Sequence, residues 1–229
     1  MDSMQIIIAI LIVLMTIILF LVRKKALRNS ILLIGASDSG KTLLFTQLAY
    51  DSFVETVTSM KENKASIKLN NNRNYNLIDL PGNDRLRTQY WDQFKNQAKC
   101  LIFVIDSVAF LNNTHNVADL LYQYLCDQTV QMRKIPVIVA CNKQDQTRAK
   151  SAKVIASIME KEFNIIRETR LGALDSTVAG SDEKRLPILG EPDHQFSFNE
   201  LRNRIEFVDC CASKEFKNLE NIMKSINSV

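Results

Sequence analysis

The residues that point most directly to chemistry lie between Gly35 and Thr42, where the sequence reads GASDSGKT. This is the phosphate-binding pattern G-x-x-x-x-G-K-[ST], and it stands in the required context, after an apolar run and before a helical pattern. Backbone N–H groups in such a loop turn inward around phosphates, the lysine reaches the outer phosphates, and the last hydroxyl binds Mg²⁺. We expect nucleotide contacts from Gly35, Ser37, Asp38, Ser39, Gly40, Lys41, Thr42 and Leu43, with Thr42 also on the metal.

Two shorter motifs follow predicted strands further along the chain. The first, Asp79-Leu-Pro-Gly82, brings a carboxylate to the metal and the backbone N–H of its glycine to a terminal phosphate. The second, Asn142-Lys143-Gln-Asp145, offers a carboxylate that can accept hydrogen bonds from the N1–H and the exocyclic amine of guanine, a donor pair that adenine lacks. Alone, each string is common in turns. In this order after a phosphate loop, they predict a site for GTP or GDP with Mg²⁺.

Hydrolysis of GTP needs a group that orients water, usually a glutamine directly after the glycine of D-x-x-G. Asn83 occupies that position and is one methylene shorter. The alternative is that Asn83 only turns the chain into the following helix, and the residue type alone leaves both interpretations open. His115 and His194 lie in helix-start and loop contexts rather than beside the motifs. We therefore expect slow intrinsic hydrolysis, with no certain catalytic residue and with nucleotide binding as the main function.

The helix predicted after D-x-x-G has two stripes. Leu86, Tyr90 and Phe94 recur at helical spacing, which predicts that they face the core. Arg87 and Trp91 lie on a different stripe. Exposed arginine and tryptophan are typical interface anchors, so this stripe is a candidate partner surface. The alternative is that Trp91 packs internally.

Short apolar runs alternate with helical patterns from Ser30 onward. A run of Asn and Arg at residues 70–74 predicts a turn between two strands, hence a hairpin. The alternation predicts a three-layer α/β domain of the P-loop type, with a mostly parallel six-stranded sheet and one antiparallel hairpin. Residues 168–195, rich in Ser, Asp, Gly and Pro, are expected to form a mobile insertion. The predicted strands are 31–34, 65–69, 75–80, 100–106, 136–141 and 204–209, and the predicted helices are 43–50, 117–125, 151–163 and 219–226.

The N-terminal segment has the pattern of a membrane anchor. Residues 6–22 carry no charge, and as a helix they span roughly 26 Å, close to the ~27 Å apolar core of an endoplasmic reticulum bilayer. Four basic residues follow within residues 23–29, whereas one acid precedes. The positive-inside rule then predicts a lumenal N-terminus at 1–5, a single transmembrane helix at 6–22, a basic juxtamembrane linker at 23–29 and a cytosolic domain at 30–229. A cleaved signal peptide would need a basic start and a small-residue cleavage site, which are missing.

The composition agrees with an anchored domain. The 229 residues are 46% apolar and 24% charged, and the mean hydropathy of −0.07 averages an apolar start with an ordinary domain. Removing the four basic residues and one acid of the first 29 leaves 25 basic against 24 acidic residues, so the domain carries about +1 and no direct nucleic-acid binding is expected. Five cysteines without a C-x-x-C pair argue against a disulfide framework or a zinc site.

Taken together, these motifs resemble the small GTPase superfamily, and within its Arf/Sar-like branch the beta-subunit family of the signal recognition particle receptor. The likeness runs from about residue 31 to 226, and the N-terminal anchor has the same placement. The strings that carry it are DSGKTLLF at 38–45, NNNR at 70–73, LIDLPG at 77–82, ACNKQD at 140–145 and KSAK at 150–153.

The resemblance implies further site residues. Thr58 looks like the first-switch threonine that senses Mg²⁺ and the terminal phosphate, with Thr56 as the alternative. Cys211-Ala212-Ser213 takes the place of the family's Ser-Ala-Lys loop, so the backbone N–H of Ala212 is expected on the guanine oxygen. Ser213 departs from the family's lysine, which puts in doubt only the side-chain part of that contact.

The resemblance also implies a partner and a place. The switches would grip the receptor's alpha subunit in a heterodimer at the endoplasmic reticulum membrane, near ribosome and translocon, for co-translational targeting of secretory and membrane proteins. An Arf- or Sar-like trafficking GTPase with a regulated hydrolysis cycle is the alternative. Myristoylated proteins of that kind need glycine directly after the first Met, and this chain has Asp2 there.

Overall fold

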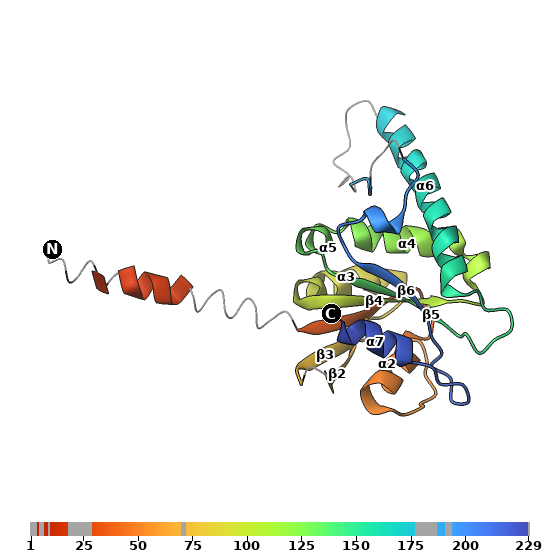
Figure 1. Ribbon diagram of the computed structural model, residues 1–229, viewed down its shortest axis with the longest axis horizontal. Helices are drawn as coiled ribbons and strands as arrows, with labels where there is room; N and C mark the ends of the chain where they lie inside the picture. The colour runs from red at the N-terminus through yellow and green to blue at the C-terminus, as the bar shows by residue number, and fades with distance from the viewer. Residues whose placement is uncertain are drawn as a thin grey trace.

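The computed structural model describes residues 4, 7–8, 10–17, 29–69, 72–176, 187–190 and 194–228. From Ser30 onward, strands and helices alternate along most of the chain, as the sequence pattern predicts (Figure 1). The elements are β1 (Ser30–Ile34), α2 (Lys41–Tyr50), β2 (Asn63–Lys68), β3 (Asn74–Asp79), α3 (Asp84–Phe94), β4 (Ala98–Asp106), α4 (Thr114–Cys126), α5 (Gln128–Arg133), β5 (Val137–Asn142), α6 (Ala152–Ser176), β6 (Ile205–Asp209) and α7 (Glu220–Asn227). Short 3₁₀ turns lie at Lys95–Gln97, Phe110–Asn112 and Phe198–Glu200.

The six strands form one sheet in the order β2-β3-β1-β4-β5-β6. Strands β2 and β3 pair antiparallel with Asn63 opposite Asp79, which confirms the predicted hairpin. The pairs β1–β3, β1–β4, β4–β5 and β5–β6 are parallel. Because parallel strands end at the same edge of a sheet, the loops after β1, β3, β4, β5 and β6 meet there. This edge carries the motifs found in the sequence.

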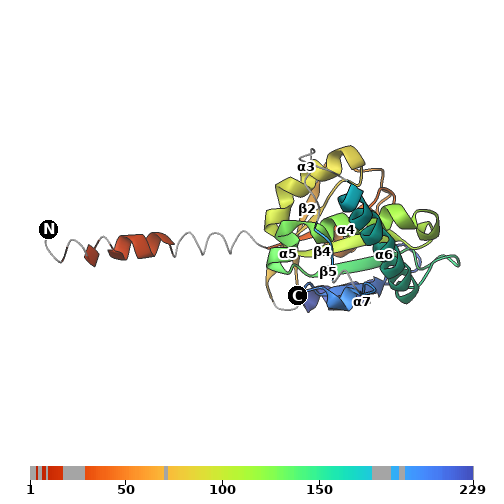
Figure 2. The same cartoon turned by 90° about the horizontal axis from the view of Figure 1, so that it is seen from above.

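Helices cover both faces of the sheet. Successive side chains of a strand point to opposite faces, so Leu32 and Ile34 of β1 join one core cluster while Ile31 and Leu33 join the other. The first cluster packs under α3, α4, α5 and α6, and the second packs under α2 and α7. Seen from above in Figure 2, β4 and β5 lie between α4 and α7. The predicted three-layer arrangement is confirmed.

Helix α6 differs from the prediction. It does not end near residue 163 but continues to Ser176, for 25 residues in all. The buried stripe Ile155, Met159 and Phe163 continues to Ile166. Core packing therefore carries the helix past its predicted end at residue 163 and toward the segment that composition marked as polar. Residues 168–176, predicted to begin a mobile insertion, are helical.

The rest of the predicted insertion, residues 177–195, is described only in part. Leu189 and Phe196 are buried in the cluster that α6 covers, and the Phe196 N–H donates a 2.8 Å hydrogen bond to Asn164 Oδ1. These contacts hold the segments 187–190 and 194–196 on the domain. Residues 177–186 and 191–193 of the predicted insertion lie outside the described residues.

The predicted membrane span is described only in part. Residues 7–8 and 10–17 are helical, whereas the other residues of 6–22 and residues 23–28 lie outside the described part of the chain. Among the helices that the structure describes, none has the length and apolar character needed to cross a membrane.

Candidate nucleotide-binding site

The phosphate loop joins β1 to α2 and depends on two glycines. Gly35 has φ +138°, and a Cβ there would lie 2.4 Å from the Val104 carbonyl oxygen of β4. Gly40 has φ +86°, and its Cβ would lie 2.4 Å from the Asn142 amide nitrogen. Only glycine fits both the conformation and the space at these positions. Gly40 caps α2 without a side-chain hydrogen bond, which leaves the first N–H groups of the helix available to an anionic ligand.

Lys41 is a buried cation beside this loop. Its side chain is held in a largely enclosed position, and Nζ donates a 2.6 Å hydrogen bond to the Ala36 carbonyl oxygen. Burial lowers the pKa of Lys41 to about 8, although the negative charges of Asp79 and Asp38 act in the opposite direction. A buried ammonium group is costly unless a negative charge pairs with it. The terminal phosphates of a nucleotide would supply that charge.

A cluster of oxygen ligands lies at the start of α2. Thr42 Oγ1 donates a 2.8 Å hydrogen bond to Asp79 Oδ2, which also accepts from Asn63 Nδ2 at 3.0 Å. Asp79 is completely buried, and burial raises the pKa of its carboxyl group. Within the described chain, its Oδ1 has no hydrogen-bond partner. An orphan carboxylate oxygen beside a hydroxyl suits a hard cation, so these residues fit Mg²⁺.

The guanine-reading motif lies where β5 ends. Asn142 is buried and bridges two loops, because Nδ2 donates to the Ser39 carbonyl oxygen at 3.0 Å and Oδ1 accepts from the Ala212 N–H at 3.3 Å. A cavity of about 190 Å³ opens beside this bridge. Its lining is Gly40, Leu43, Asn142, Lys143, Asp145, Gln146, Cys211, Ala212 and Ser213. The structure thus brings the phosphate loop and the N-K-x-D motif together, as the sequence predicts.

Asp106 is a candidate site residue that the sequence reasoning did not single out. It ends β4, and its Oδ2 accepts a 2.7 Å hydrogen bond from Lys143 Nζ. Burial acts to raise the pKa of Asp106, but hydrogen bonds from Lys143 and from the N–H groups of Ala109 and Val108 outweigh it and lower the pKa. This pairing holds Lys143, whose φ of +67° is left-handed, at the junction of the two motifs. The position of Asp106 at the end of a predicted parallel strand is the signal that could have found it.

Comparison with known proteins identifies the family. The family model of the signal recognition particle receptor beta subunit matches residues 26–205. The chain belongs to this family. A mouse signal recognition particle receptor subunit beta is 41% identical over 209 residues, covering 90% of this chain and 77% of the relative.

Solved structures agree with this membership. The structure of the mammalian SRP receptor aligns with a TM-score of 0.76 at 36% identity, over 87% of this chain and 98% of that one. A GDP–Mg form of the receptor's beta subunit from Chaetomium thermophilum aligns with a TM-score of 0.64 at 26% identity, over 87% of this chain and 96% of that one. This beta-subunit family member therefore has the small GTPase fold predicted from its sequence.

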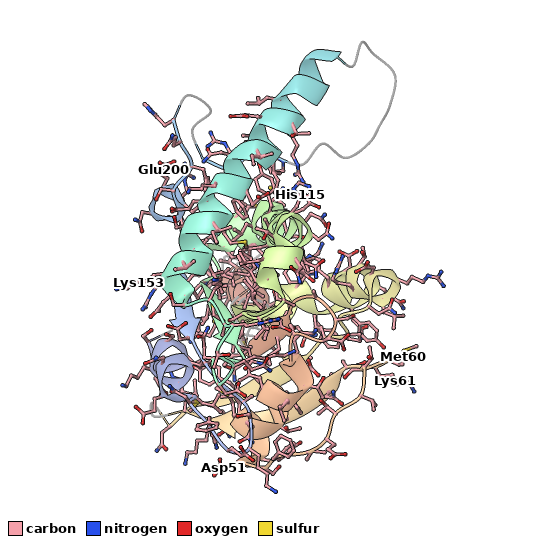
Figure 3. All side chains as sticks on the ribbon, turned by 90° about the vertical axis from the view of Figure 1, so that its right-hand side faces the viewer. Asp51, Met60, Lys61, His115, Lys153 and Glu200 are labelled. Carbon is pink, nitrogen blue, oxygen red and sulfur yellow. The ribbon has the colours of Figure 1, made fainter. Side chains whose placement is uncertain are left out.

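In the first-switch segment, residues 51–62, the neighbour of the predicted Thr58 lies nearest to the hydroxyl of Thr42. Thr56, Thr58 and Ser59 line a cavity of about 340 Å³ together with Lys41 and Thr42. Thr58 is exposed, whereas Ser59 Oγ lies 2.9 Å from Thr42 Oγ1. Figure 3 labels Asp51 and Met60, near the two ends of the first-switch segment that joins α2 to β2.

The hairpin explains why Ser59 lies beside Thr42. Asn63 opens β2 opposite Asp79, so residues just before β2 lie beside the end of β3, where the carboxylate stands. The string ETVTSM at residues 55–60 does not by itself indicate which hydroxyl lies beside the metal-binding residues. The pairing of the two predicted strands is the signal that could have selected Ser59.

Two other candidate site residues make hydrogen bonds within the chain. The Ala212 N–H, expected on guanine, donates to Asn142 Oδ1 in this structure. Asn83 caps α3, since its Oδ1 accepts a 3.0 Å hydrogen bond from the Arg85 N–H. That contact corresponds to the interpretation of Asn83 as the residue that turns the chain into a helix.

Gly82 fixes how closely this turn approaches the phosphate loop. A Cβ on Gly82 would lie 2.6 Å from Lys41 Nζ and 2.9 Å from the Ser37 nitrogen. The absence of a side chain at Gly82 thus allows the start of α3 to lie against the phosphate-binding residues. A terminal phosphate held by Lys41 would therefore lie next to the segment that precedes α3.

Proposed function

We propose that this chain binds GTP and GDP with Mg²⁺ and acts as the GTP-binding beta subunit of a signal recognition particle receptor. The observation that carries the proposal is the convergence of three groups on one edge of the sheet. These groups are the buried Lys41, the Thr42–Asp79 pair with its orphan oxygen, and the base-side cavity bounded by Asn142 and Asp145. Family membership supports the same conclusion.

Each group has a chemical task in nucleotide binding. The α2 N-terminus and Lys41 would hold the phosphates, and Asp145 would accept hydrogen bonds from the guanine edge. Thr42, Asp79 and a first-switch hydroxyl, Ser59 or Thr58, would hold Mg²⁺, which supplies positive charge to the phosphates. Loss of the terminal phosphate would release the first switch, so binding of GTP rather than GDP would order this segment.

The proposed partner is the receptor's alpha subunit, in a heterodimer. The relatives are named as a receptor's beta subunit, which implies at least one further subunit. The first-switch segment offers a surface for such a partner, since Phe53, Val54, Val57 and Met60 are exposed apolar side chains beside the site. A partner that covered them would sense the nucleotide state directly.

The proposed location is the endoplasmic reticulum membrane, with tethering of the alpha subunit near ribosomes and the translocon for co-translational targeting. The apolar run 6–22 would be the single span, 1–5 would be lumenal, and 30–229 would be cytosolic, because the basic residues follow the run. A protease-protection assay on microsomes tests this topology. A tag at the C-terminus should be digested and one at the N-terminus protected; the reverse pattern would contradict the proposed orientation.

A pull-down tests the partner. The full-length chain, solubilised in detergent and loaded with GTP or GDP, should retain the alpha subunit preferentially with GTP. Asp145→Asn is the matched control, since an amide can donate to the 2-oxygen of xanthine and should move the preference from guanine to xanthine nucleotides. Retention of the alpha subunit by that variant with XTP, but not with GTP, would tie the interaction to the nucleotide. Failure of the wild-type chain to retain it under GTP would refute the partner while leaving nucleotide binding to be measured directly.

A further inference from the structure

The edge of the sheet opposite the candidate nucleotide site is rich in basic residues. The parallel strands begin at this edge, as the register of Ser30 in β1 with Ala98 in β4 shows. The segments that lie here, which we call the basic face, are residues 68–69, 72–74, 95–99, 133–136 and 202–206. They contain eight basic residues and one acidic residue. Because residues 30–229 as a whole contain 25 basic and 24 acidic residues, the rest of the domain is acidic.

Hydrogen bonds between neighbouring segments make the basic face one continuous surface. Arg133 Nη1, at the end of α5, donates a 2.8 Å hydrogen bond to the carbonyl oxygen of Asn96, in the turn after α3. Asn203 Nδ2, just before β6, donates a 2.9 Å hydrogen bond to the carbonyl oxygen of Ile135. Segments far apart in the sequence are thus held side by side, and their charges act together.

Much of the positive charge is exposed to solvent. The acidic side chains nearby are taken up by two basic residues: Glu206 pairs with Arg204 at 3.0 Å, and Asp92 and Asp127 pair with Lys95. The first pair is weak, because its side chains are 55% and 37% exposed. The exposed basic side chains of the face are Lys68, Arg73, Lys134, Arg202 and Arg204.

Two further features of this edge suit a lipid surface. Ser30 opens β1 here, directly after the basic linker 23–29, so the face continues the positive charge that follows the apolar run 6–22. The start of β1 and helix α5 lie on the same side of the domain (Figure 1). Met132, in the last turn of α5, is an apolar side chain that is 75% exposed next to Lys134. Basic residues around an exposed apolar side chain are typical of surfaces that lie on anionic bilayers.

We propose that the basic face docks on the anionic lipid headgroups of the bilayer that holds the chain. This inference rests on the proposed membrane location. A tethered domain stays close to the bilayer, so the attraction of several basic residues for anionic headgroups is enough to select one orientation. The nucleotide site, at the carboxyl ends of the parallel strands, then faces away from the bilayer, where a cytosolic partner can reach the first-switch segment.

The experiment uses the full-length chain in nanodiscs of phosphatidylcholine, with or without phosphatidylserine. Acylation of lysines by a water-soluble ester, followed by mass spectrometry, measures which amines the bilayer covers. Lys68 and Lys134 should react about threefold more slowly in the discs that contain phosphatidylserine. Lys153, exposed at the start of α6 and labelled in Figure 3, is the internal control and should react equally in both kinds of disc.

Charge reversal and salt test the cause of this protection. The double variant Arg202→Glu with Arg204→Glu should lose the protection of Lys68 and Lys134. Arg148→Glu with Lys153→Glu, the matched control, changes the net charge equally on the other side of the domain and should keep it. Raising the ionic strength from about 0.1 M to about 1 M shortens the Debye length from about 10 Å to about 3 Å, so it should remove the protection in the wild type.

The outcomes separate this inference from the proposed function. Equal acylation of Lys68 in the two kinds of disc would overturn the inference while leaving the anchor standing. Protection that survives high salt would also overturn it, and this arm decides even if the double variant does not fold. Protection by added ribosomal RNA rather than by phosphatidylserine would assign the face to nucleic acid and overturn it. Failure of the wild-type chain to elute with the discs would overturn the proposed location and this inference together.

Discussion

The indole Nε1 of Trp91 in α3 donates a 2.9 Å hydrogen bond to Asp127 Oδ2, at the N-terminus of α5. The same oxygen accepts from Lys95 Nζ at 3.2 Å, and Asp127 Oδ1 caps α5 through the Thr129 N–H at 2.7 Å. Trp91 also packs edge-to-face on Tyr124, with ring centroids 4.8 Å apart. Trp91 is therefore buried within the domain, and its interpretation as an exposed partner anchor is wrong. One carboxylate connects α3 to α5.

This contact predicts a pH-dependent stability. Burial acts to raise the pKa of Asp127, but hydrogen bonds from Trp91, Thr129 and Lys95 lower it overall. A carboxyl group whose folded pKa is depressed stabilises the fold above its unfolded value near 3.8, and this contribution is lost as the pH falls through the folded value. Asp127→Asn should cost roughly 1–2 kcal/mol at pH 7, where a charged acceptor is replaced by a neutral one.

Urea unfolding followed by tryptophan fluorescence measures this cost, because Trp91 is the chain's single tryptophan. The difference between wild type and Asp127→Asn should shrink between pH 5 and pH 3. Asp92→Asn is the control, since Asp92 pairs with the same Lys95 on the exposed side and should change stability little. A difference that stays constant with pH would contradict the assignment.

The sequence predicted elements better than contacts between elements. Apolar runs were enough to predict the strands of the sheet, because burial on both faces leaves a local pattern in the sequence. The turn-rich string at residues 70–74 was likewise enough to predict the hairpin. The burial of Trp91 could not be predicted from its position on the helix, since its hydrogen-bond partner Asp127 lies 36 residues away in the sequence. The predicted end of α6 was too early, because the packing of Ile166 in the core, rather than local composition, continues the helix.

The candidate site shows the same limit. The glycines and Lys41 have fixed spacing within one motif, so they were found from the sequence. Ser59 and Asp106 contact Thr42 and Lys143, and these contacts become visible only once β2 lies beside β3 and β4 beside β5. The residues of one motif lie together as the motif predicts, whereas the positions of Ser59 and Asp106 depend on strand pairing that the motifs do not contain.

Asn83→Ala separates capping from catalysis. Because Asn83 Oδ1 accepts from the Arg85 N–H, the substitution should lower the unfolding free energy by about 1 kcal/mol, the usual cost of a lost N-cap. Single-turnover GTP hydrolysis, which we expect to be slow in the wild type, should stay within about threefold. Asn83→Asp keeps a capping acceptor and should retain stability. A tenfold or greater loss of hydrolysis in Asn83→Ala, with stability unchanged, would instead assign Asn83 to the attacking water.

Ser59→Ala and Thr58→Ala test which first-switch hydroxyl senses the metal. Ser59 Oγ lies 2.9 Å from Thr42 Oγ1, so its loss should weaken Mg²⁺-dependent GTP binding about tenfold. Thr58→Ala should change it less than twofold. Binding of a fluorescent GTP analogue, measured with Mg²⁺ and then with EDTA, gives the Mg²⁺-dependent affinity of each variant. GDP serves as the control because it lacks the terminal phosphate. A larger effect at Thr58 than at Ser59 would show that the switch rearranges when GTP binds.

Gly40→Ala should damage nucleotide binding more than it damages folding. Gly40 has φ +86°, and a Cβ there would lie 2.4 Å from Asn142 Nδ2. The left-handed conformation costs roughly 1–2 kcal/mol for a residue with a Cβ, and the clash pushes Asn142 away from the Ser39 carbonyl oxygen that it bridges. Both the phosphate loop and the base-reading loop then lose their mutual support. GDP affinity should fall tenfold or more, since two of the three groups that we propose hold the nucleotide move.

The matched control is Gly190→Ala, at another glycine with a left-handed conformation. Gly190 has φ +73°, but its Cβ would meet only the end of the Glu200 side chain at 3.3 Å and the Phe196 ring at 3.4 Å. It should lose a similar amount of stability from backbone strain and keep its GDP affinity, because it lies outside the nucleotide site. Calorimetry of GDP binding and thermal unfolding of the two variants make the comparison. Equal GDP affinities in the two variants would mean that the contact between Gly40 and Asn142 does not organise the site.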